Sequence, residues 1–353
     1  MAVFDHSAFD DHERVLFCRD AASGLSAIIA IHSTVLGPAA GGCRLWRYES
    51  EDAALYDVLR LSQGMSYKNA MANLDFGGGK AVILKTADFS GSEALFEKYG
   101  DFVDSLNGSY ITAEDVGMSV EIMETIARRT KYVTGLPKKE GQAGGDPSPK
   151  TAWGIFKGIA AAVQFKLSRD DLEGLSVAVQ GIGHVGYSLC RYLHDAGAKL
   201  VVADINEERV TAAREEFGAT AAGLDDILFQ PVDVVSPCAL GAILTATTIP
   251  KLRTSIVAGA ANNQLETPAD GQRLADAGIL YAPDYVINAG GIINVAAEYY
   301  GNADDEEVIR QVEAIGPRLT NIFDQAAATG RPTNAIADEQ ARKIIRGRTN
   351  ATG

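Results

Sequence analysis

The chain has 353 residues, of which 46% are hydrophobic and 22% charged, and its 32 Lys+Arg against 46 Asp+Glu leave a formal net charge of −14. This length predicts two domains with cores large enough to need no disulfide or metal, and the acidic balance argues against nucleic acid or an anionic membrane as the main partner. The first residues show no basic segment followed by an apolar stretch, and no apolar run is long enough to span a bilayer, so we expect a cytoplasmic protein.

Four widely spaced cysteines, Cys18, Cys43, Cys190 and Cys238, form no Cys-x-x-Cys pair, which is typical of reduced thiols in the cytosol. Cys190 and His194 lie one helical turn apart, but zinc needs three or four ligands and no others cluster nearby. We therefore expect no metal site.

In chain order, the first half mixes strand-like and helical patterns. Strand-like runs occupy residues 26–32 and 80–84, and helical patterns occupy residues 52–72, 91–106 and 120–129. Residues 138–149 then combine charges, glycines and two prolines, which sustain neither a helix nor a central strand. This segment is predicted to be an interdomain hinge.

After residue 150 the pattern alternates strictly between the two kinds of element. Helices are expected at 151–165, 186–196 and 207–217, and strands at 176–180, 200–203, 232–235 and 255–258. This alternation predicts a doubly wound α/β domain whose parallel sheet is covered on both faces. The predicted domains are residues 1–145 and 146–330, and the C-terminal helix 331–353, basic over 338–348, is expected to pack back on the first domain or on a neighbouring subunit.

A glycine motif follows the apolar strand 176–180 and opens a helix. Gly181 permits a tight turn, Gly183 lets the backbone approach a pyrophosphate at the helix N-terminus, and Gly186 lets helix and strand pack closely. Asp204 follows the next strand, at the sequence distance from Gly181 that is expected of a carboxylate that binds a ribose diol. A carboxylate there would repel a 2′-phosphate, which favours NAD over NADP. Alternatively, Asp204 only caps the helix that begins near Asn206. The residues of this half predicted to contact the cofactor are Gly181, Gly183, His184, Val185, Gly186, Asp204 and Ile205.

Two lysines in the first half have unusual surroundings. Lys68 continues the apolar stripe that includes Leu61 and Met65, so it either extends to the surface or meets a substrate carboxylate. Lys80 follows three glycines that would let a ligand approach the backbone. It is either an ordinary edge-strand cation or, if buried beside another ammonium, a usable base near neutral pH.

Asp115 lies in segment 110–117, which we interpret as a turn before a helix capped by Ser119. An aspartate in such a turn is usually structural. By itself this residue predicts no function.

Taken together, seven segments resemble the glutamate/leucine/phenylalanine/valine dehydrogenase family, and most of all its leucine-specific members. In the first half they are residues 36–42, 64–69, 77–80 and 112–117, which include Lys68, Lys80 and Asp115; beyond them they are 145–149, 259–264 and 281–291. The resemblance covers nearly the whole chain. It implies an α/β substrate-binding and oligomerisation domain, a Rossmann NAD domain and an active-site cleft between the two.

The resemblance also implies an activity, in which an L-amino acid, NAD and water give a 2-oxo acid, ammonia and NADH, reversibly. Lys68 would bind the substrate carboxylate together with Asn262 and the backbone at Gly41 and Gly42. Lys80 would be the general base that activates water to attack the imine, and Asp115 would hold the amino group and relay protons. Thr151, Asn262 and Asn288 would lie at the cofactor.

Substrate choice depends on five positions that match the family's side-chain pocket, namely Ala40, Met65, Ala113, Ile292 and Val295. All are apolar, which disfavours a charged substrate such as glutamate. Leucine-specific members usually have a bulkier aliphatic residue where this chain has Ala40. Either the pocket is therefore larger, which makes an aromatic substrate an alternative, or neighbouring residues fill the space.

Two other functions fit these residues less well. A non-catalytic NAD-binding subunit would not need Lys68, Lys80 and Asp115 together. A 2-hydroxy-acid dehydrogenase normally uses a His–carboxylate pair, for which the five histidines offer no good candidate. Family members are commonly homo-oligomers, often octamers, so a homo-oligomer is expected.

Overall fold

The structure is a computed structural model that describes residues 3–86, 89, 91–137, 145–301 and 303–349, so most of the predicted hinge lies outside the described residues. The chain divides into two compact units. The first unit comprises Met1–Gly145, Val295–Asp304 and Ala341–Gly353, and the second comprises Asp146–Asn294 and Asp305–Gln340. Two segments differ from the predicted division: residues 295–304 belong to the first unit, and residues 331–340 stay with the second.

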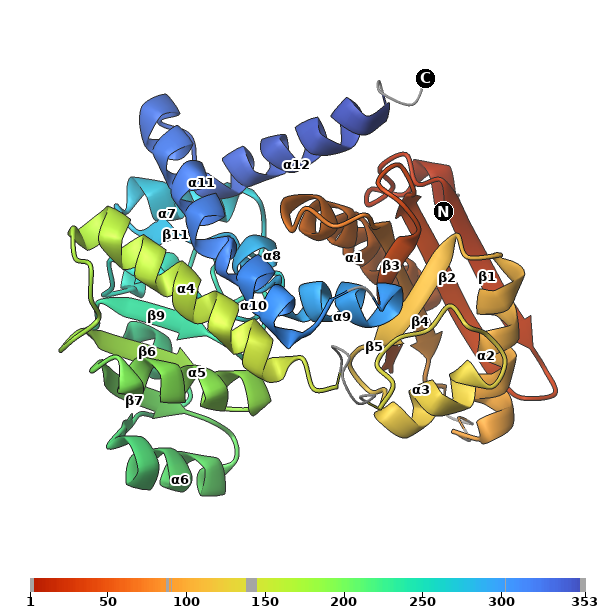
Figure 1. Cartoon of the computed structure of the whole chain (residues 1–353), viewed down its shortest axis with the longest axis horizontal. Coiled ribbons are helices and arrows are strands. Elements are labelled where there is room, and N and C mark those ends of the chain that lie inside the picture. Colours follow the sequence, from red (N-terminus) through yellow and green to blue (C-terminus); the bar gives the residue numbers. More distant parts are fainter. Residues whose placement is uncertain (1–2, 87–88, 90, 138–144, 302, 350–353) are drawn as a thin grey trace. The chain divides into compact units, whose positions relative to one another are not determined.

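A five-stranded mixed sheet forms the centre of the first unit (Figure 1). Its strands are β1 (Arg14–Asp20), β2 (Leu25–Ser33), β3 (Ala39–Trp46), β4 (Gly77–Leu84) and β5 (Tyr110–Glu114), in the order β1-β2-β4-β3-β5. Strand β3 pairs in parallel with both β4 and β5, whereas β1–β2 and β2–β4 are antiparallel. The sequence pattern missed β1 and β3 and suggested a turn where β5 lies.

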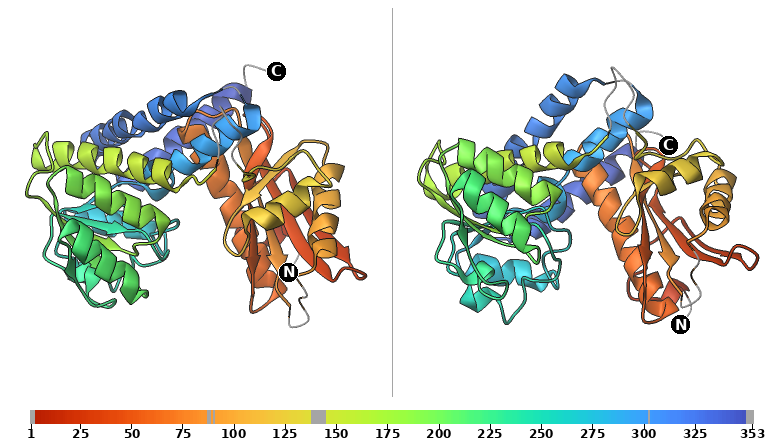
Figure 2. Two further views of the ribbon diagram at one scale, coloured as in Figure 1. Left: turned by 60° about the horizontal axis from the view of Figure 1, so that its bottom comes forward. Right: turned by 90° about the horizontal axis from the view of Figure 1, so that it is seen from below.

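Helices cover both faces of this sheet, as the further views in Figure 2 show. They are α1 (Glu51–Met71), α2 (Glu93–Ser105) and α3 (Val120–Ala127). Alternate residues of β2 serve the two faces: Ile28 packs in a core with α1, and Ile29 packs in a core with α2 and α3. Ser119 caps α3 as predicted, because its side chain accepts a hydrogen bond from the backbone N–H of Ile122.

The second unit contains a six-stranded, all-parallel sheet in the order β11-β10-β9-β6-β7-β8. Its strands are β6 (Ser176–Gln180), β7 (Lys199–Ala203), β8 (Thr220–Ala221), β9 (Val234–Pro237), β10 (Ile256–Val257) and β11 (Leu280–Tyr281). The predicted doubly wound sheet is therefore confirmed. The strand order reverses at β6, where β7 pairs on one side and β9 on the other, and ligands of such folds bind outside the carboxyl ends of the strands at this point.

The helices of the second unit alternate with these strands and then follow them. They are α4 (Ser148–Leu167), α5 (His184–Asp195), α6 (Glu207–Phe217), α7 (Ala269–Asp276), α8 (Asp284–Ile287), α10 (Asp305–Glu313) and α11 (Ile315–Thr329). Two further helices, α9 (Gly290–Tyr300) and α12 (Thr333–Thr349), begin in this unit and end in the first. Three short 3-10 helices lie at Val3–Asp5, Ile227–Phe229 and Ile249–Lys251.

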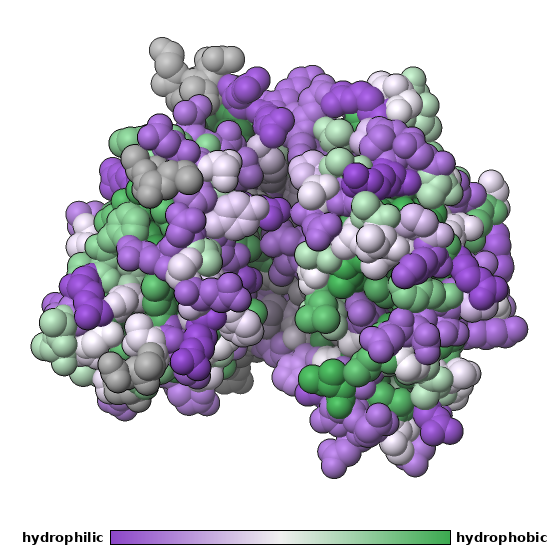
Figure 3. All heavy atoms as spheres, turned by 180° about the vertical axis from the view of Figure 1, so that it is seen from behind, coloured by the Kyte–Doolittle hydropathy of each residue, from purple (hydrophilic) through white to green (hydrophobic). Residues whose placement is uncertain are grey.

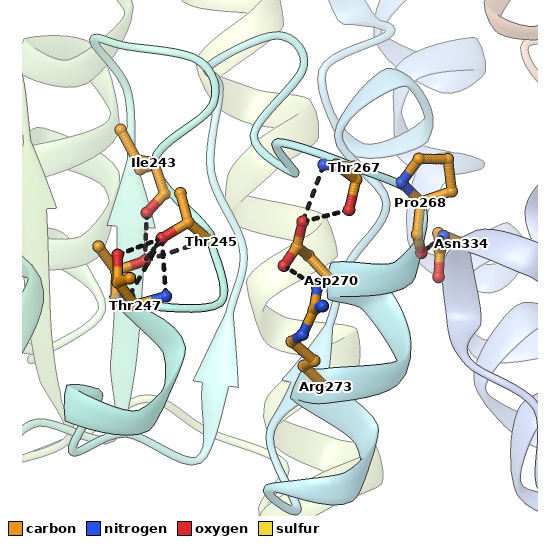
Figure 4. A network of polar contacts seen from close by, with 9 residues as sticks. Ile243, Thr245, Thr247, Thr267, Pro268, Asp270, Arg273 and Asn334 are labelled. Carbon is orange, nitrogen blue, oxygen red and sulfur yellow. Dashed lines mark hydrogen bonds and ion pairs between the residues drawn. The ribbon is translucent and has the colours of Figure 1, made fainter.

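Polar side chains order the loops between the later strands (Figure 4). The hydroxyl groups of Thr245 and Thr247 are 2.9 Å apart in one loop. At the start of α7, the buried Asp270 carboxylate accepts hydrogen bonds from the backbone and hydroxyl groups of Thr267 and from Arg273. These contacts replace a cap, because the N-cap residue of α7 is Pro268, which has no polar side chain.

Hydrophilic residues predominate on the face shown in Figure 3, and hydrophobic residues form smaller patches there. Among the described residues, no helix has both the length and the apolar composition that a membrane crossing requires.

Candidate active site

The structure brings together the two predicted catalytic residues, Lys80 and Asp115. Lys80 lies in β4 with a side chain only 8% exposed, and its Nζ is 2.5 Å from Oδ2 of Asp115. Asp115 directly follows β5, which is held beside β4 by the intervening β3. One of the two alternatives for Lys80 placed it beside another ammonium, whereas the group in contact with its Nζ is a carboxylate.

A third charged residue, Arg44 of β3, completes this group and was missed by the sequence analysis. Its Nε is 3.4 Å from Oδ2 of Asp115, and its Nη1 donates to Oδ2 of Asp57 at 2.9 Å. Tyr48 donates a further hydrogen bond of 2.6 Å to the same oxygen of Asp57. No motif marks Arg44, because its role depends on the pairing of β3 with β5.

Asp115 is held in its charged form by these neighbours. Burial raises the pKa of the Asp115 carboxyl, but the positive charges of Lys80 and Arg44 outweigh burial and lower the pKa to about 2. The carboxylate therefore stays ionised at neutral and alkaline pH and can hold an ammonium group.

Gly41 and Gly42 lie against this charged group and leave no room for side chains. A Cβ on Gly41 would be 1.9 Å from the carbonyl oxygen of Gly79 and 3.2 Å from Cγ of Met65. A Cβ on Gly42 would be 2.7 Å from Cβ of Asp115. Four predicted residues, namely Gly41, Gly42, Met65 and Asp115, are thus neighbours in the first unit.

Lys68 lies on α1, three residues after Met65, and is half-buried. The turn of α1 that contains Ser66 and Lys68 packs closely on β4. A Cβ on Gly78 of β4 would be only 2.1 Å from Oγ of Ser66. This packing places Lys68 on the helix that borders the site. Its contact with a substrate carboxylate stays a prediction.

The predicted side-chain pocket is more filled around Ala40 than its small residue suggests. Ala40 is 1% exposed and packs in a cluster with Phe76, Ile111 and Ala296, against which Leu74 and Tyr299 also pack. This arrangement favours the alternative in which neighbours occupy the space beside Ala40. Ala113, also buried, pairs with Gly42 across the sheet.

The two remaining pocket residues, Ile292 and Val295, lie one turn apart on α9. The division between the units falls between them, because Ile292 belongs to the second unit and Val295 to the first.

In the second unit, the glycine motif has the geometry that dinucleotide binding needs. Gly181 has φ +85°, and a Cβ there would be 2.6 Å from Cβ of Ala239. Gly183 is the N-cap of α5, whose first turn contains His184 and Val185. A Cβ on Gly186 would be 2.0 Å from the carbonyl oxygen of Gly181, so only glycine permits this close approach of helix and loop.

Asp204 holds this loop in place. Its Oδ2 accepts a hydrogen bond of 2.7 Å from the backbone N–H of Ile182, and its Oδ1 accepts one of 2.8 Å from Asn206. The cap of α6 is Asn206 itself, so capping that helix is not the role of Asp204. Ile205, the next residue, is 87% exposed. Arg209 has no counterpart among the predicted site residues, and its Nη1 is 4.0 Å from Oδ1 of Asp204.

The three polar residues of the second unit that the resemblance places at the cofactor lie near α8 and in the first turn of α4. Asn288 donates from Nδ2 to the side chain of Asn262 at 2.7 Å and to the carbonyl of Ala260 at 2.9 Å. Its Oδ1 is buried and accepts no hydrogen bond within the described part of the chain, so it can accept one from a carboxamide. Thr151 donates its hydroxyl proton to the carbonyl of Pro147 at 2.9 Å, which leaves its lone pairs to accept. These residues fit a nicotinamide dinucleotide.

Two family models match most of this chain. The Glu/Leu/Phe/Val dehydrogenase dimerisation domain matches residues 12–132, and the Glutamate/Leucine/Phenylalanine/Valine dehydrogenase domain matches residues 202–345. The chain is 50% identical to leucine dehydrogenase of Geobacillus stearothermophilus over 345 residues, which cover 98% of this chain and 94% of that protein.

Relatives with aromatic substrates in their names are also similar. Phenylalanine dehydrogenase of Lysinibacillus sphaericus is 44% identical over 96% of this chain and 89% of its own. The crystal structure of L-tryptophan dehydrogenase from Nostoc punctiforme superposes with a TM-score of 0.83 at 46% identity, covering 96% of this chain and 97% of that one. The chain therefore belongs to the Glu/Leu/Phe/Val dehydrogenase family, whose members are amino-acid dehydrogenases that use a nicotinamide cofactor.

Proposed function

We propose that this protein catalyses the NAD-dependent, reversible oxidative deamination of an apolar L-amino acid, with leucine and other branched-chain amino acids as its preferred substrates. The observation that carries the proposal is the Lys80–Asp115 ion pair beside the glycine backbone of β3. A buried lysine and a partly buried carboxylate in contact would supply the two proton-transfer groups that deamination needs.

The first unit would bind and prepare the amino acid. Lys68, the backbone of Gly41 and Gly42, and Asn262 of the second unit would bind its carboxylate. The ionised Asp115 would accept hydrogen bonds from its amino group. Bound NAD would supply the acceptor for the hydride that leaves Cα.

Substrate binding would change the balance of charges around the Lys80–Asp115 contact. When the substrate ammonium also approaches Asp115, three cations, including Arg44, surround one carboxylate, which favours the loss of a proton from one of them. Lys80 would then take a proton from the water that attacks the imine. Asp115 would keep the developing ammonia in place.

An aliphatic substrate is supported by the packing around Ala40. Phe76 is fully buried beside it, and the Phe76 and Tyr299 ring centroids are 5.8 Å apart, so these rings fill space that an aromatic substrate would need. The similarity to phenylalanine and tryptophan dehydrogenases supports the alternative of an aromatic substrate. An apolar pocket discriminates by only about 1–3 kcal/mol per methylene, so activity on several substrates is compatible with either proposal.

For the cofactor we propose NAD, because a 2′-phosphate would approach the Asp204 carboxylate. Arg209 is the residue that opposes this preference, since its guanidinium is partly exposed beside Asp204. We also propose a homo-oligomer that acts on small molecules and binds neither membrane nor nucleic acid.

The test is NADH formation at alkaline pH with a panel of L-amino acids, run in parallel with NADP. Fastest turnover with leucine, valine or isoleucine is the expected result. Fastest turnover with phenylalanine or tryptophan would replace the substrate proposal, and no turnover with any amino acid, despite measurable NADH binding, would overturn the catalytic one.

A further inference from the structure

The helix that carries Thr151 begins without a conventional cap. The N-cap residue of α4 is Pro147, which makes no side-chain hydrogen bond, and a second proline, Pro149, occupies the first turn. The backbone N–H and the hydroxyl group of Thr151 both donate hydrogen bonds to the carbonyl of Pro147, each of 2.9 Å. Locally, Oδ1 of Asp146 accepts the backbone N–H of Ser148 at 2.9 Å, and contacts with other elements add to this cap.

Lys150 supplies those contacts with a single ammonium group. Its Nζ is 2.6 Å from Oδ1 of Asn294 on α9 and 2.5 Å from Oδ1 of Asp305 at the start of α10. The Lys150 side chain is 15% exposed, and Asn294 is fully buried. Three segments of the second unit that are distant in sequence are thus joined at one point, and Asn294 and Asp305 are the residues at which the chain leaves and re-enters this unit.

The same turn of α4 lies directly on the start of α9. A Cβ on Gly290 would be 2.4 Å from the carbonyl oxygen of Lys150, and one on Gly291 would be 2.9 Å from Oγ1 of Thr151. Backbone meets backbone here without intervening side chains. A shift of the Lys150 turn would therefore move the Thr151 hydroxyl relative to α9.

We propose that Lys150 is a positioning residue for the nicotinamide end of the cofactor site, which sets the place of the Thr151 hydroxyl by tying the first turn of α4 to Asn294 and Asp305. This inference rests on the proposed function and on the place of Thr151 beside the nicotinamide that the family resemblance implies. Without the ammonium, the buried Oδ1 of Asn294 loses the hydrogen bond from Lys150 and the link from α4 to Asp305 is broken, so the turn is free to shift.

The experiment compares the binding of NADH and ADP-ribose to Lys150→Met by isothermal titration calorimetry. ADP-ribose contains the adenosine and the diphosphate but no nicotinamide, so it reports the glycine motif alone. Lys150→Met is expected to weaken NADH binding about tenfold, as the loss of a charge-assisted hydrogen bond would, and to leave ADP-ribose binding within about twofold. Lys150→Arg, which keeps the charge, is expected to recover most of the NADH affinity.

Lys157→Met is the matched control, because Lys157 lies on the same helix and its Nζ is 3.1 Å from Oε1 of Glu313 on α10, away from Thr151. It should change neither affinity. Unchanged NADH binding by Lys150→Met, or an equal loss of both ligands, would overturn the proposal. If Lys150→Met does not fold, Asp305→Asn, which removes the more exposed partner, must show the same selective loss. Both affinities are measured without turnover, so failure of the proposed amino-acid activity is recognised separately.

Discussion

At the scale of single residues, the proposed chemistry depends on charges that lie close together in the first unit. Lys80, Asp115 and Arg44 come from three neighbouring strands or their ends, and Asp57 and Tyr48 extend the group through Arg44. Each side chain constrains the charge state or orientation of the next. Two of the predictions at this scale concern these contacts, and a third concerns Lys68 on the neighbouring helix α1.

Replacing Lys80 by Ala should reduce kcat by at least about 10²-fold, the lower range for loss of general acid–base catalysis, because no other group would take the proton of the attacking water. NADH affinity should remain nearly unchanged, since the glycine motif belongs to the other unit. Steady-state kinetics and NADH titration check both parts, and a loss of NADH binding would show that Lys80 has been placed wrongly.

Replacing Lys68 by Ala should chiefly raise the KM for the amino acid, by about 10-fold or more if one charged hydrogen bond to the substrate carboxylate is lost. Lys98→Ala is the control, because Lys98 is 41% exposed on α2 and pairs with Asp101. An unchanged KM for Lys68→Ala would exclude the carboxylate role.

Replacing Arg44 by Met should make the protein more sensitive to acid. The pKa of Asp115 in the folded protein, about 2, lies below the ordinary 3.8, so its stabilising contribution is complete above 3.8 and is lost as the pH falls towards 2. Removing one of its two cations raises that pKa, so acid unfolding should begin at a higher pH in a circular-dichroism titration. Arg128→Met, which removes an exposed ion pair with Glu93, should leave the midpoint in place.

At the scale of elements, the site is positioned by the close packing of α1 on β4. The glycines before Lys80 lie within β4 itself, and a Cβ on Gly78 would be 2.2 Å from the backbone nitrogen of Ser66. Backbone atoms cannot move aside as the end of a flexible side chain can. Because Gly78 has no side chain, the turn of α1 between Met65 and Lys68 can lie directly against the backbone of β4.

Gly78→Ala should accordingly destabilise the protein by about 1–3 kcal/mol, the usual range for overpacking, and should raise the KM for the amino acid by displacing α1. Gly64→Ala is the matched control. Gly64 also lies in α1, and a Cβ there would have no neighbouring atom within 4 Å. That change should stabilise the protein by about 0.5–1 kcal/mol. Chemical denaturation of both variants measures the two effects, and equal effects would contradict this account of the packing.

At the scale of the whole molecule, each of the two units has a hydrophobic core of its own. NADH at about 100 times its Kd should stabilise the second unit by about 2.7 kcal/mol, because binding to the folded form alone shifts the unfolding equilibrium. Scanning fluorimetry should show that NADH raises the Tm of the wild type and of Lys80→Ala by the same amount. A Tm that does not respond to NADH would contradict the cofactor site at Gly181–Gly186.

The sequence by itself determined those features that short segments encode. Strict alternation of strands and helices predicts the doubly wound sheet, the Gly181–Gly186 motif needs only a strand, a turn and a helix, and Ser119 caps α3 within one turn. Local periodicity and local hydrogen bonding suffice for such features. The motifs around Lys80 and Asp115 also identified the family, although they did not predict the contact between the two residues.

Only the tertiary structure decided what depends on the pairing of distant segments. The mixed order of the first sheet brings Arg44 to Asp115, makes a carboxylate the neighbour of Lys80, and surrounds Ala40 with Phe76 and other buried residues. Lys150 likewise gains its partners from two helices far along the chain. The energies of these contacts depend on distances and burial across strands and helices, and no local pattern of residues carries that information.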